Sequence, residues 1–352
     1  MSKFKESLDK TSALEQELQV LRNYKRKALG DIQRLTSELA EVRNTLETTE
    51  NILGTDLTVP VWLAPDKPKS SAATIKVILS DTHFDEVVNP DEVDGLNAYD
   101  RTIAEQRLER WAQNIIKVSR HYLSGMKYDG LVLSLGGDIF SGDIHEELKE
   151  TNADTILGSL LHWSEQIAAA ISLLHDEFKN IHVVSVVGNH GRTTRKPRAK
   201  LRAKTNFDWL LAKMLERHYA GIDSVSFQIP DGADALIKIY EYGHLLTHGD
   251  QASGGGGIGG VWPPIMRLRA RKAQRYLAMN ENFSTMWCGH WHQLVQTPGL
   301  IVNGSLKGWD EYAAVSNFPY EQPQQAFAIV TPDNGITIQA PIFCQNRKKE
   351  KW

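Results

Sequence analysis

The chain has little cysteine and no long hydrophobic segment. Only Cys288 and Cys344 occur among 352 residues, too few for a disulfide-rich secreted scaffold. No apolar run approaches the roughly 18 residues that a membrane-spanning helix needs. The first residues also lack the apolar core of a signal peptide. We therefore expect a protein of the reducing cytoplasm that does not bind membranes.

Residues 1–53 contain no proline and few aromatic residues. Their apolar residues recur at alternating steps of three and four from Leu14 to Leu53, which is the heptad pattern of a coiled-coil helix. Such an apolar seam has to be buried, so we predict a homo-oligomer formed through residues 14–53. Two alternatives remain: an αα-hairpin that folds back at Gly30-Asp31, or an amphipathic helix that packs on its own domain.

The rest of the chain divides by composition. Residues 54–73 carry Pro60, Pro65 and Pro68 and are predicted to be a linker. Residues 74–345 form the main domain, and 346–352 are a charged tail. In the main domain strands and helices alternate up to about residue 223, after which mostly strands follow, including one predicted over Ala235–Tyr242 and a basic helix over Pro264–Met279. This α/β (α+β) pattern predicts two packed sheets flanked by helices.

Five short polar fragments follow one another in the main domain, and four of them come directly after an apolar run. They are Asp81-Thr82-His83, Gly137-Asp138, Gly188-Asn189-His190, Thr247-His248-Gly249 and Gly289-His290-Trp291-His292. Polar side chains at the carboxyl ends of strands in an open α/β sheet line a binding crevice. A single Asp-x-His or Gly-Asp is only a turn signal, but five such fragments in order indicate a site for two divalent cations that share one carboxylate.

These fragments resemble the motifs of the calcineurin-like metallophosphoesterase superfamily, in particular its phage and bacterial DNA-repair exonucleases. The resemblance covers about Thr74 to Cys344 and implies a β-sandwich flanked by helices. It also implies that one metal is bound by Asp81, His83 and His292. The second metal would be bound by Asn189, His248 and His290, and both would share Asp138.

The resemblance further implies that His190 is the catalytic histidine, which contacts the substrate phosphate and protonates the leaving oxygen. One position departs from the family: Gly191 stands where the superfamily usually has Asp or Glu, a carboxylate that would orient His190. Asp208 and Asp85 are the candidates to replace it.

The expected chemistry is hydrolysis by a hydroxide that bridges two cations. Mixed oxygen and nitrogen ligands favour Mn²⁺, with Fe, Zn²⁺ or Ni²⁺ as alternatives, over Mg²⁺, which prefers oxygen.

Two basic segments point to a polyanionic substrate, although the net charge of the chain is −3. Seven of the thirteen residues from Arg192 to Lys204 are basic, as are five of the nine from Arg267 to Arg275. Phosphate contacts dominate nucleic-acid affinity, so we predict that DNA or RNA binds there. The candidate contacts are Arg192, Arg195, Lys196, Arg198, Lys200, Arg202, Arg267, Arg269 and Arg271.

Three functions are therefore open. The first is a nuclease that hydrolyses DNA or RNA. The second is a phosphatase or cyclic-nucleotide phosphodiesterase for a small molecule, which the basic segments disfavour. The third is a non-enzymatic scaffold that uses the coiled coil to join partners.

Overall fold

The computed structural model describes residues 60–63, 72–252 and 260–351, together with Lys25, Gly30 and Thr36. The chain divides into two compact units, Met1–Thr58 and Val59–Trp352. The three described residues of the first unit are helical, and the predicted coiled coil and its oligomer otherwise lie outside the described residues. All elements below belong to the second unit.

The first sheet has six strands in the order β11-β10-β1-β2-β3-β4. Strands β1 to β4 run parallel, and β10 pairs antiparallel with β1 and with β11. The strands are β1 (Ala72–Leu79), β2 (Lys127–Leu135), β3 (Ile181–Ser185), β4 (Val225–Gln228), β10 (Gln324–Thr331) and β11 (Gly335–Phe343).

The second sheet has five strands in the order β5-β6-β7-β9-β8, of which β6, β7 and β9 are parallel. The strands are β5 (Asp234–Ile239), β6 (Tyr242–Thr247), β7 (Thr285–Cys288), β8 (Val295–Thr297) and β9 (Leu300–Val302).

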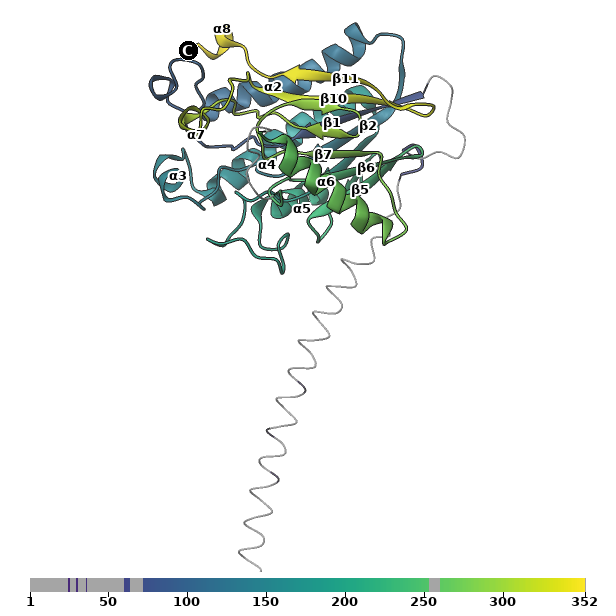
Figure 1. Cartoon of the computed structure of the whole chain (residues 1–352), viewed down its shortest axis with the longest axis horizontal. Coiled ribbons are helices and arrows are strands. Elements are labelled where there is room, and N and C mark those ends of the chain that lie inside the picture. Colours follow the sequence, from purple (N-terminus) through teal and green to yellow (C-terminus); the bar gives the residue numbers. More distant parts are fainter. Residues whose placement is uncertain are drawn as a thin grey trace, which may run out of the picture. The chain divides into compact units, whose positions relative to one another are not determined.

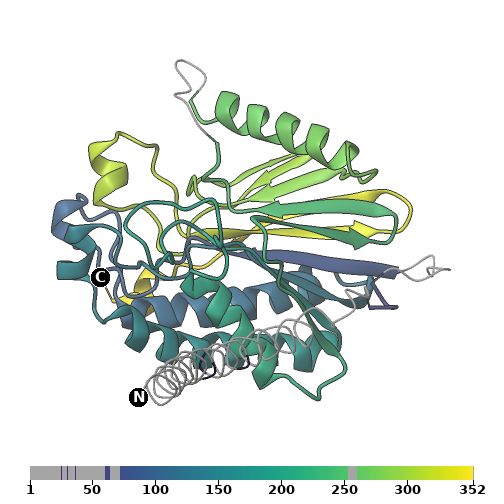
Figure 2. The same ribbon diagram turned by 90° about the horizontal axis from the view of Figure 1, so that it is seen from below.

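Helices cover the outer faces of both sheets, as Figures 1 and 2 show. The helices α2 (Arg101–Lys117), α4 (Ile156–Phe178) and α5 (Phe207–His218) pack on the first sheet, and α6 (Trp262–Leu277) lies along the second. Side chains cap the first three at their amino ends: Asp100, Thr155 and Asn206 each accept a backbone N–H. Shorter helical segments are α3 (Glu146–Thr151), α7 (Glu311–Val315), α8 (Arg347–Glu350), the 3₁₀ turn Pro90–Glu92 and the π-turn Val118–Tyr122.

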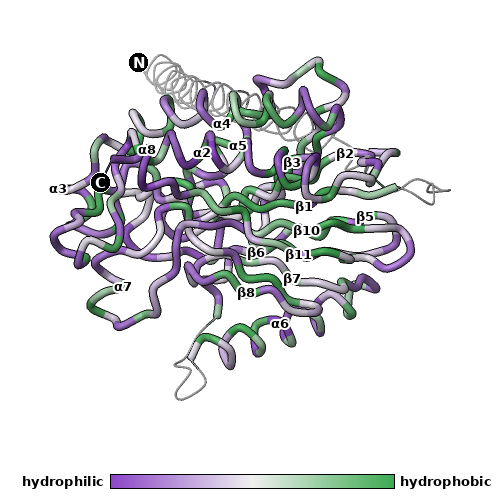
Figure 3. Tube along the Cα trace, turned by 90° about the horizontal axis from the view of Figure 1, so that it is seen from above, coloured by the Kyte–Doolittle hydropathy of each residue, from purple (hydrophilic) through white to green (hydrophobic). Residues whose placement is uncertain are grey.

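The layers enclose three apolar clusters. One lies between the first sheet and its helices, one between the two sheets, and one beneath α6. Side chains alternate across a strand, so in β1 Ile75 and Val77 point to the helices, whereas Lys76 and Ile78 point to the second sheet. Figure 3 shows the resulting hydrophobic centre of the domain and the more polar outer segments.

The two-sheet architecture predicted from the sequence is confirmed, but three predicted boundaries differ. Strand β1 begins at Ala72 and Leu63 is buried between the sheets, so the end of the predicted linker belongs to the domain. The strand predicted over Ala235–Tyr242 ends at Ile239, because Tyr240 takes a left-handed φ of 52° and starts a hairpin turn. The predicted charged tail contains α8, and Glu350 is buried against Arg107.

Among the described residues, no helix is long and apolar enough to cross a membrane.

Candidate metal centre

The five polar fragments lie at one edge of the two sheets. Each follows the carboxyl end of a strand, and the strands within each sheet that carry them are parallel, which brings the fragments together. Asp81 and His83 follow β1, Asp138 follows β2, Asn189 and His190 follow β3, His248 follows β6, and His290 and His292 follow β7.

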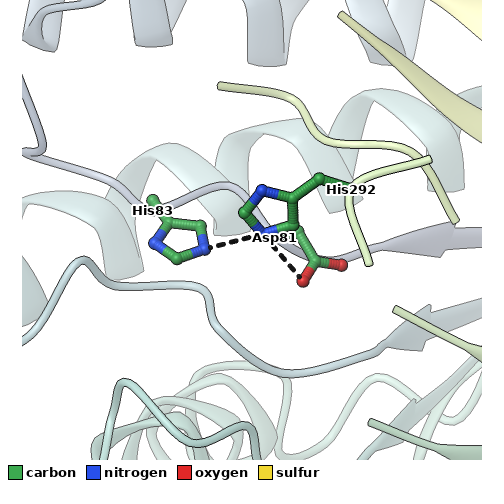
Figure 4. A group of neighbouring side chains, drawn as sticks. All are labelled: Asp81, His83 and His292. Atoms are coloured by element: carbon green, nitrogen blue, oxygen red, sulfur yellow. Dashed lines mark hydrogen bonds and ion pairs between the residues drawn. The ribbon is translucent and has the colours of Figure 1, made fainter. Parts of the chain in front are cut away.

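One cluster consists of Asp81, His83 and His292, shown in Figure 4. The Nε2 atoms of His83 and His292 are 3.2 Å apart, and Nε2 of His292 lies 3.6 Å from Oδ1 of Asp81. Both imidazoles thus direct a nitrogen toward the carboxylate, and one cation could contact all three groups.

Asp138 lies between this cluster and a second one. It groups with His83 and His190 on one side and with His248 and His290 on the other, with the ligand atoms of each group within 4.8 Å of one another. Nε2 of His248 is 3.0 Å from Oδ2 of Asp138 and 3.2 Å from Oδ1 of Asn189. The seven predicted ligands therefore surround two adjacent positions with Asp138 in the middle. Their roles as ligands stay predictions.

The backbone is strained where the ligands attach. Residues 81, 83, 138, 290 and 292 all take a left-handed φ, between 44° and 72°. Such conformations cost free energy in residues with side chains, so they persist only where the surrounding structure imposes them, and they gather at functional sites. At these residues the backbone takes a costly conformation that turns the ligand side chains toward one another.

Burial and mutual charge shift the pKa values of the cluster. Burial raises the pKa of Asp81 to about 7. Burial alone would lower the pKa of His248, but the charge of Asp138 raises it to about 10. Burial and the neighbouring His248 lower the pKa of His290 to about 4. At neutral pH these pKa values leave the carboxyl of Asp81 partly protonated and the imidazole of His248 protonated, and a bound cation would replace those protons.

A hydrogen bond to the second ring nitrogen fixes the orientation of His248, whose Nδ1 lies 2.9 Å from the carbonyl oxygen of Gly136. Because a carbonyl oxygen only accepts, Nδ1 of His248 must carry a proton, which leaves Nε2 to bind a metal. The residues present therefore fit divalent cations.

His190 lies beside the clusters and is only partly buried. Its ring is 4.5 Å from that of His83, and its Nδ1 donates to the carbonyl of Ser141 at 2.8 Å. Its Nε2 is left to face a substrate. The ring of His145, which the sequence gave no reason to select, lies 5.6 Å from that of His190.

Asp208 does not orient His190 in place of the missing acidic residue at 191. Its carboxylate instead accepts the backbone N–H groups of Asp138 at 3.1 Å and Gly188 at 2.9 Å. A β-carbon at Gly191 would lie 2.5 Å from Oδ1 of Asn206, so no side chain fits at that position. Asp85, the other candidate, bonds Arg101, Ser159 and Trp163.

The first basic segment adjoins the ligands. Arg192, Arg198 and Arg202 line a small cleft with Asn189. Arg192 donates to the carbonyls of Thr194, Asn189 and Arg195, and Arg202 pairs with Asp250 at 2.8 Å. Lys196, Arg198 and Lys200 are exposed, as is Arg195, which lies 3.5 Å from Glu146.

The second basic segment lies on α6, on the outer face of the second sheet. Arg269 donates to the carbonyl of Gly299 at 2.9 Å, while Arg267 and Arg271 are exposed. Lys272 is buried and pairs with Asp234. No contact of Arg269 or Lys272 reaches a predicted metal ligand, so this segment is less closely tied to the site than the first.

Neither a protein-family model nor a curated protein matches the chain. One solved structure that matches is a conserved uncharacterized protein, a predicted phosphoesterase, from Streptococcus pneumoniae, with 11% identity over 76% of this chain and 97% of that one, at a TM-score of 0.26. Another is the sulfate thiohydrolase SoxB from Thermus thermophilus in complex with glycerol, with 12% identity over 78% of this chain, at a TM-score of 0.30. The match spans 56% of the SoxB chain. Likenesses this weak do not assign a function, so the chemistry of the site has to be read from its own residues.

Proposed function

We propose that this protein is a two-metal phosphodiesterase, and specifically a nuclease that hydrolyses the phosphodiester bonds of DNA or RNA. The observation that carries the proposal is the position of Asp138. Its carboxylate groups with His83 and His190 and also with His248 and His290, so it could serve two cations at once. Two cations held a few ångströms apart would supply a nucleophile at neutral pH and neutralise the charge of a phosphoryl group.

The protein's own side chains supply positioning and proton transfer. Asp208 holds the backbone of Asp138 and Gly188, which fixes the shared carboxylate. His190 is anchored through Nδ1 to Ser141, which directs Nε2 outward. A protonated Nε2 there would bond the phosphoryl oxygen or donate a proton to the leaving oxygen.

The polymeric substrate is inferred from the charges next to the ligands. The segment from Arg192 to Lys204 begins two residues after His190, and its exposed residues Lys196, Arg198 and Lys200 would contact phosphates that flank the scissile bond. We propose Mn²⁺ as the activating metal, because the ligands mix oxygen and nitrogen donors.

A small-molecule phosphatase or cyclic-nucleotide phosphodiesterase is the second candidate. The hydrogen bonds of Arg192 and Arg202 favour it, because Arg192 donates to carbonyls of its own loop and Arg202 pairs with Asp250, which leaves fewer charges of the segment for a polymer. A small substrate with a single phosphate would not need the other basic residues between Arg192 and Lys204.

The test is hydrolysis by the purified protein with Mn²⁺. Labelled single-stranded DNA, double-stranded DNA, RNA and bis-p-nitrophenyl phosphate are compared, with D138N as the control. Cleavage of a polymer that D138N lacks supports the nuclease. Turnover of the small diester alone supports the second candidate, and no turnover of any of the four overturns both.

A further inference from the structure

A row of buried charged side chains extends from His83 to the side opposite the metal centre. Nδ1 of His83 lies 3.2 Å from Oε2 of Glu86, and Oε1 of Glu86 accepts from Nζ of Lys307 at 2.7 Å. Nζ of Lys307 also bonds Asp310. Glu86, Lys307 and Asp310 have no part in the mechanism above and did not belong to the fragments selected from the sequence.

The segment that carries Lys307 also makes two hydrogen bonds to the turn that supplies Asp81 and His83. Nδ2 of Asn303 donates to Oγ of Ser80 at 2.8 Å, and that hydroxyl bonds the carboxylate of Asp81. Oγ of Ser305 donates to the carbonyl oxygen of Asp81 at 2.8 Å. Three alternate residues, 303, 305 and 307, thus reach the loop that supplies Asp81 and His83, and none of these contacts reaches His248 or His290.

These charges are costly to bury. Glu86 is 7% exposed, Lys307 2% and Asp310 5%. Burying an ion pair often gives no net stability, because the desolvation penalty offsets the Coulomb attraction. Of these charges, the carboxylate of Glu86 is the one that lies against the imidazole of His83, at 3.2 Å. A carboxylate on the far nitrogen of a ligand histidine fixes the ring and strengthens it as a metal ligand.

We propose that Glu86 and Lys307 are a positioning pair that orients His83 and sets the affinity of the Asp81–His83–His292 group for its cation. The inference rests on the two-metal site of the proposed function but not on its substrate. Loss of the pair weakens binding at that position and leaves the position formed by Asn189, His248 and His290 with its affinity intact. Substitutions of residues that are not themselves metal ligands can therefore change the affinity of one metal position and not the other.

The experiment measures metal content, not activity. Purified E86Q and K307M are dialysed against a range of Mn²⁺ concentrations, and bound metal is counted by mass spectrometry. The parent is expected to bind two equivalents. Each variant is expected to keep one, and to bind the other about 10–100-fold more weakly. K307R keeps the charge and is expected to restore most of the affinity.

K76M is the matched control. Lys76 is another fully buried lysine, but it bonds Oγ of Ser134 at 2.9 Å and contacts the ring of Trp287 between the sheets. This variant should bind both equivalents as the parent does. E86D retains the charge but is one methylene shorter, so it tests the contacts of the carboxylate without removing its charge and should also lose affinity.

Parental affinity for both equivalents in E86Q, E86D and K307M would overturn the proposal. So would an equal loss in K76M, because the effect would then follow from removing any buried lysine and not from the contacts of Lys307. A parent that binds two Mn²⁺ but cleaves no phosphodiester refutes the proposed function and leaves this inference standing.

Discussion

Gly188 lies directly against the carboxylate of Asp138: a β-carbon added at residue 188 would be 2.0 Å from Oδ1. The turn after β3 can therefore approach the shared carboxylate only because residue 188 has no side chain. The same relationship holds in the other sheet, where a β-carbon at Gly289 would be 2.1 Å from Oδ2 of Asp81. Both carboxylates are thus packed against backbone from a second motif, which places the motifs at contact distance.

The first prediction is that Gly188→Ala displaces Asp138. The added methyl group has to push the carboxylate or the turn away, and overpacking of this kind costs about 1–3 kcal/mol. Mn²⁺ titration should show weaker binding, and urea unfolding should show the loss of stability. Gly232→Ala is the control, since a β-carbon there meets nothing within 4 Å. Equal metal binding by both variants would contradict the packing described here.

The second prediction is that Asp138→Asn abolishes hydrolysis. The amide keeps the shape but loses the charge and one oxygen of the carboxylate that groups with His83 and His190 and with His248 and His290. The rate on bis-p-nitrophenyl phosphate should fall to background. Glu147→Gln, an equal charge change on the exposed helix α3, should keep the parental rate. Full activity in D138N would mean that the ligands are wrongly assigned.

The sequence predicted those parts of the site that depend on local pattern. An apolar run that ends in Asp81, Asp138 or His248 already implies a strand followed by a polar turn, and parallel strands bring their carboxyl ends to one edge. The two sheets follow from the same pattern.

Contacts between distant segments carry no such signal. Lys307 and Glu86 are 221 positions apart, and no periodicity relates them. The hydrogen bonds from the backbone of Asp138 and Gly188 to Asp208 could not be predicted either. A lone Asp in the first turn of a helix is normally an exposed residue that stabilises the helix dipole. Composition also could not separate Arg192, which bonds its own loop, from the exposed Arg198.

The third prediction concerns the salt dependence of DNA binding. Replacing Lys196, Arg198 and Lys200 by Ala removes three exposed charges from the first basic segment, whose Arg198 lines a cleft with Asn189. If they contact phosphates, affinity falls and the slope of log affinity against log salt becomes shallower, by about 0.9 for each lost contact with duplex DNA. Fluorescence anisotropy at several salt concentrations measures the slope.

A second triple variant controls for net charge. Lys117, Lys127 and Lys238 are also exposed, but Lys127 begins β2 and so lies at the opposite end of the strands from the site. Replacing these three by Ala should leave the slope unchanged. Equal slopes in both triple variants would rule out phosphate contacts by the first segment.

The fourth prediction concerns pH and stability. Burial between the sheets lowers the pKa of Lys76 to about 7, against 10.5 for an unburied lysine. Between those two values the unfolded chain holds a proton that the folded chain has lost, so stability rises with pH across this window. Below about pH 7 both states are protonated, and the cost of burying the charge applies in full, at about 1.4 kcal/mol for each unit of pKa difference.

Lys76→Met removes that charge while keeping an unbranched apolar side chain in the core. We expect the variant to be more stable than the parent by a few kcal/mol at pH 6, and the advantage to shrink as the pH rises to 9. Urea unfolding of both proteins at pH 6, 7, 8 and 9 measures this difference. The difference between the two curves reports Lys76 together with His182 and His244, because, besides burial, the charge of Lys76 lowers the pKa of both imidazoles. Loss of the bond to Ser134 lowers the stability of the variant by about 1 kcal/mol at every pH and does not alter the slope. Parallel curves for the two proteins would show that Lys76 keeps an ordinary pKa between the sheets.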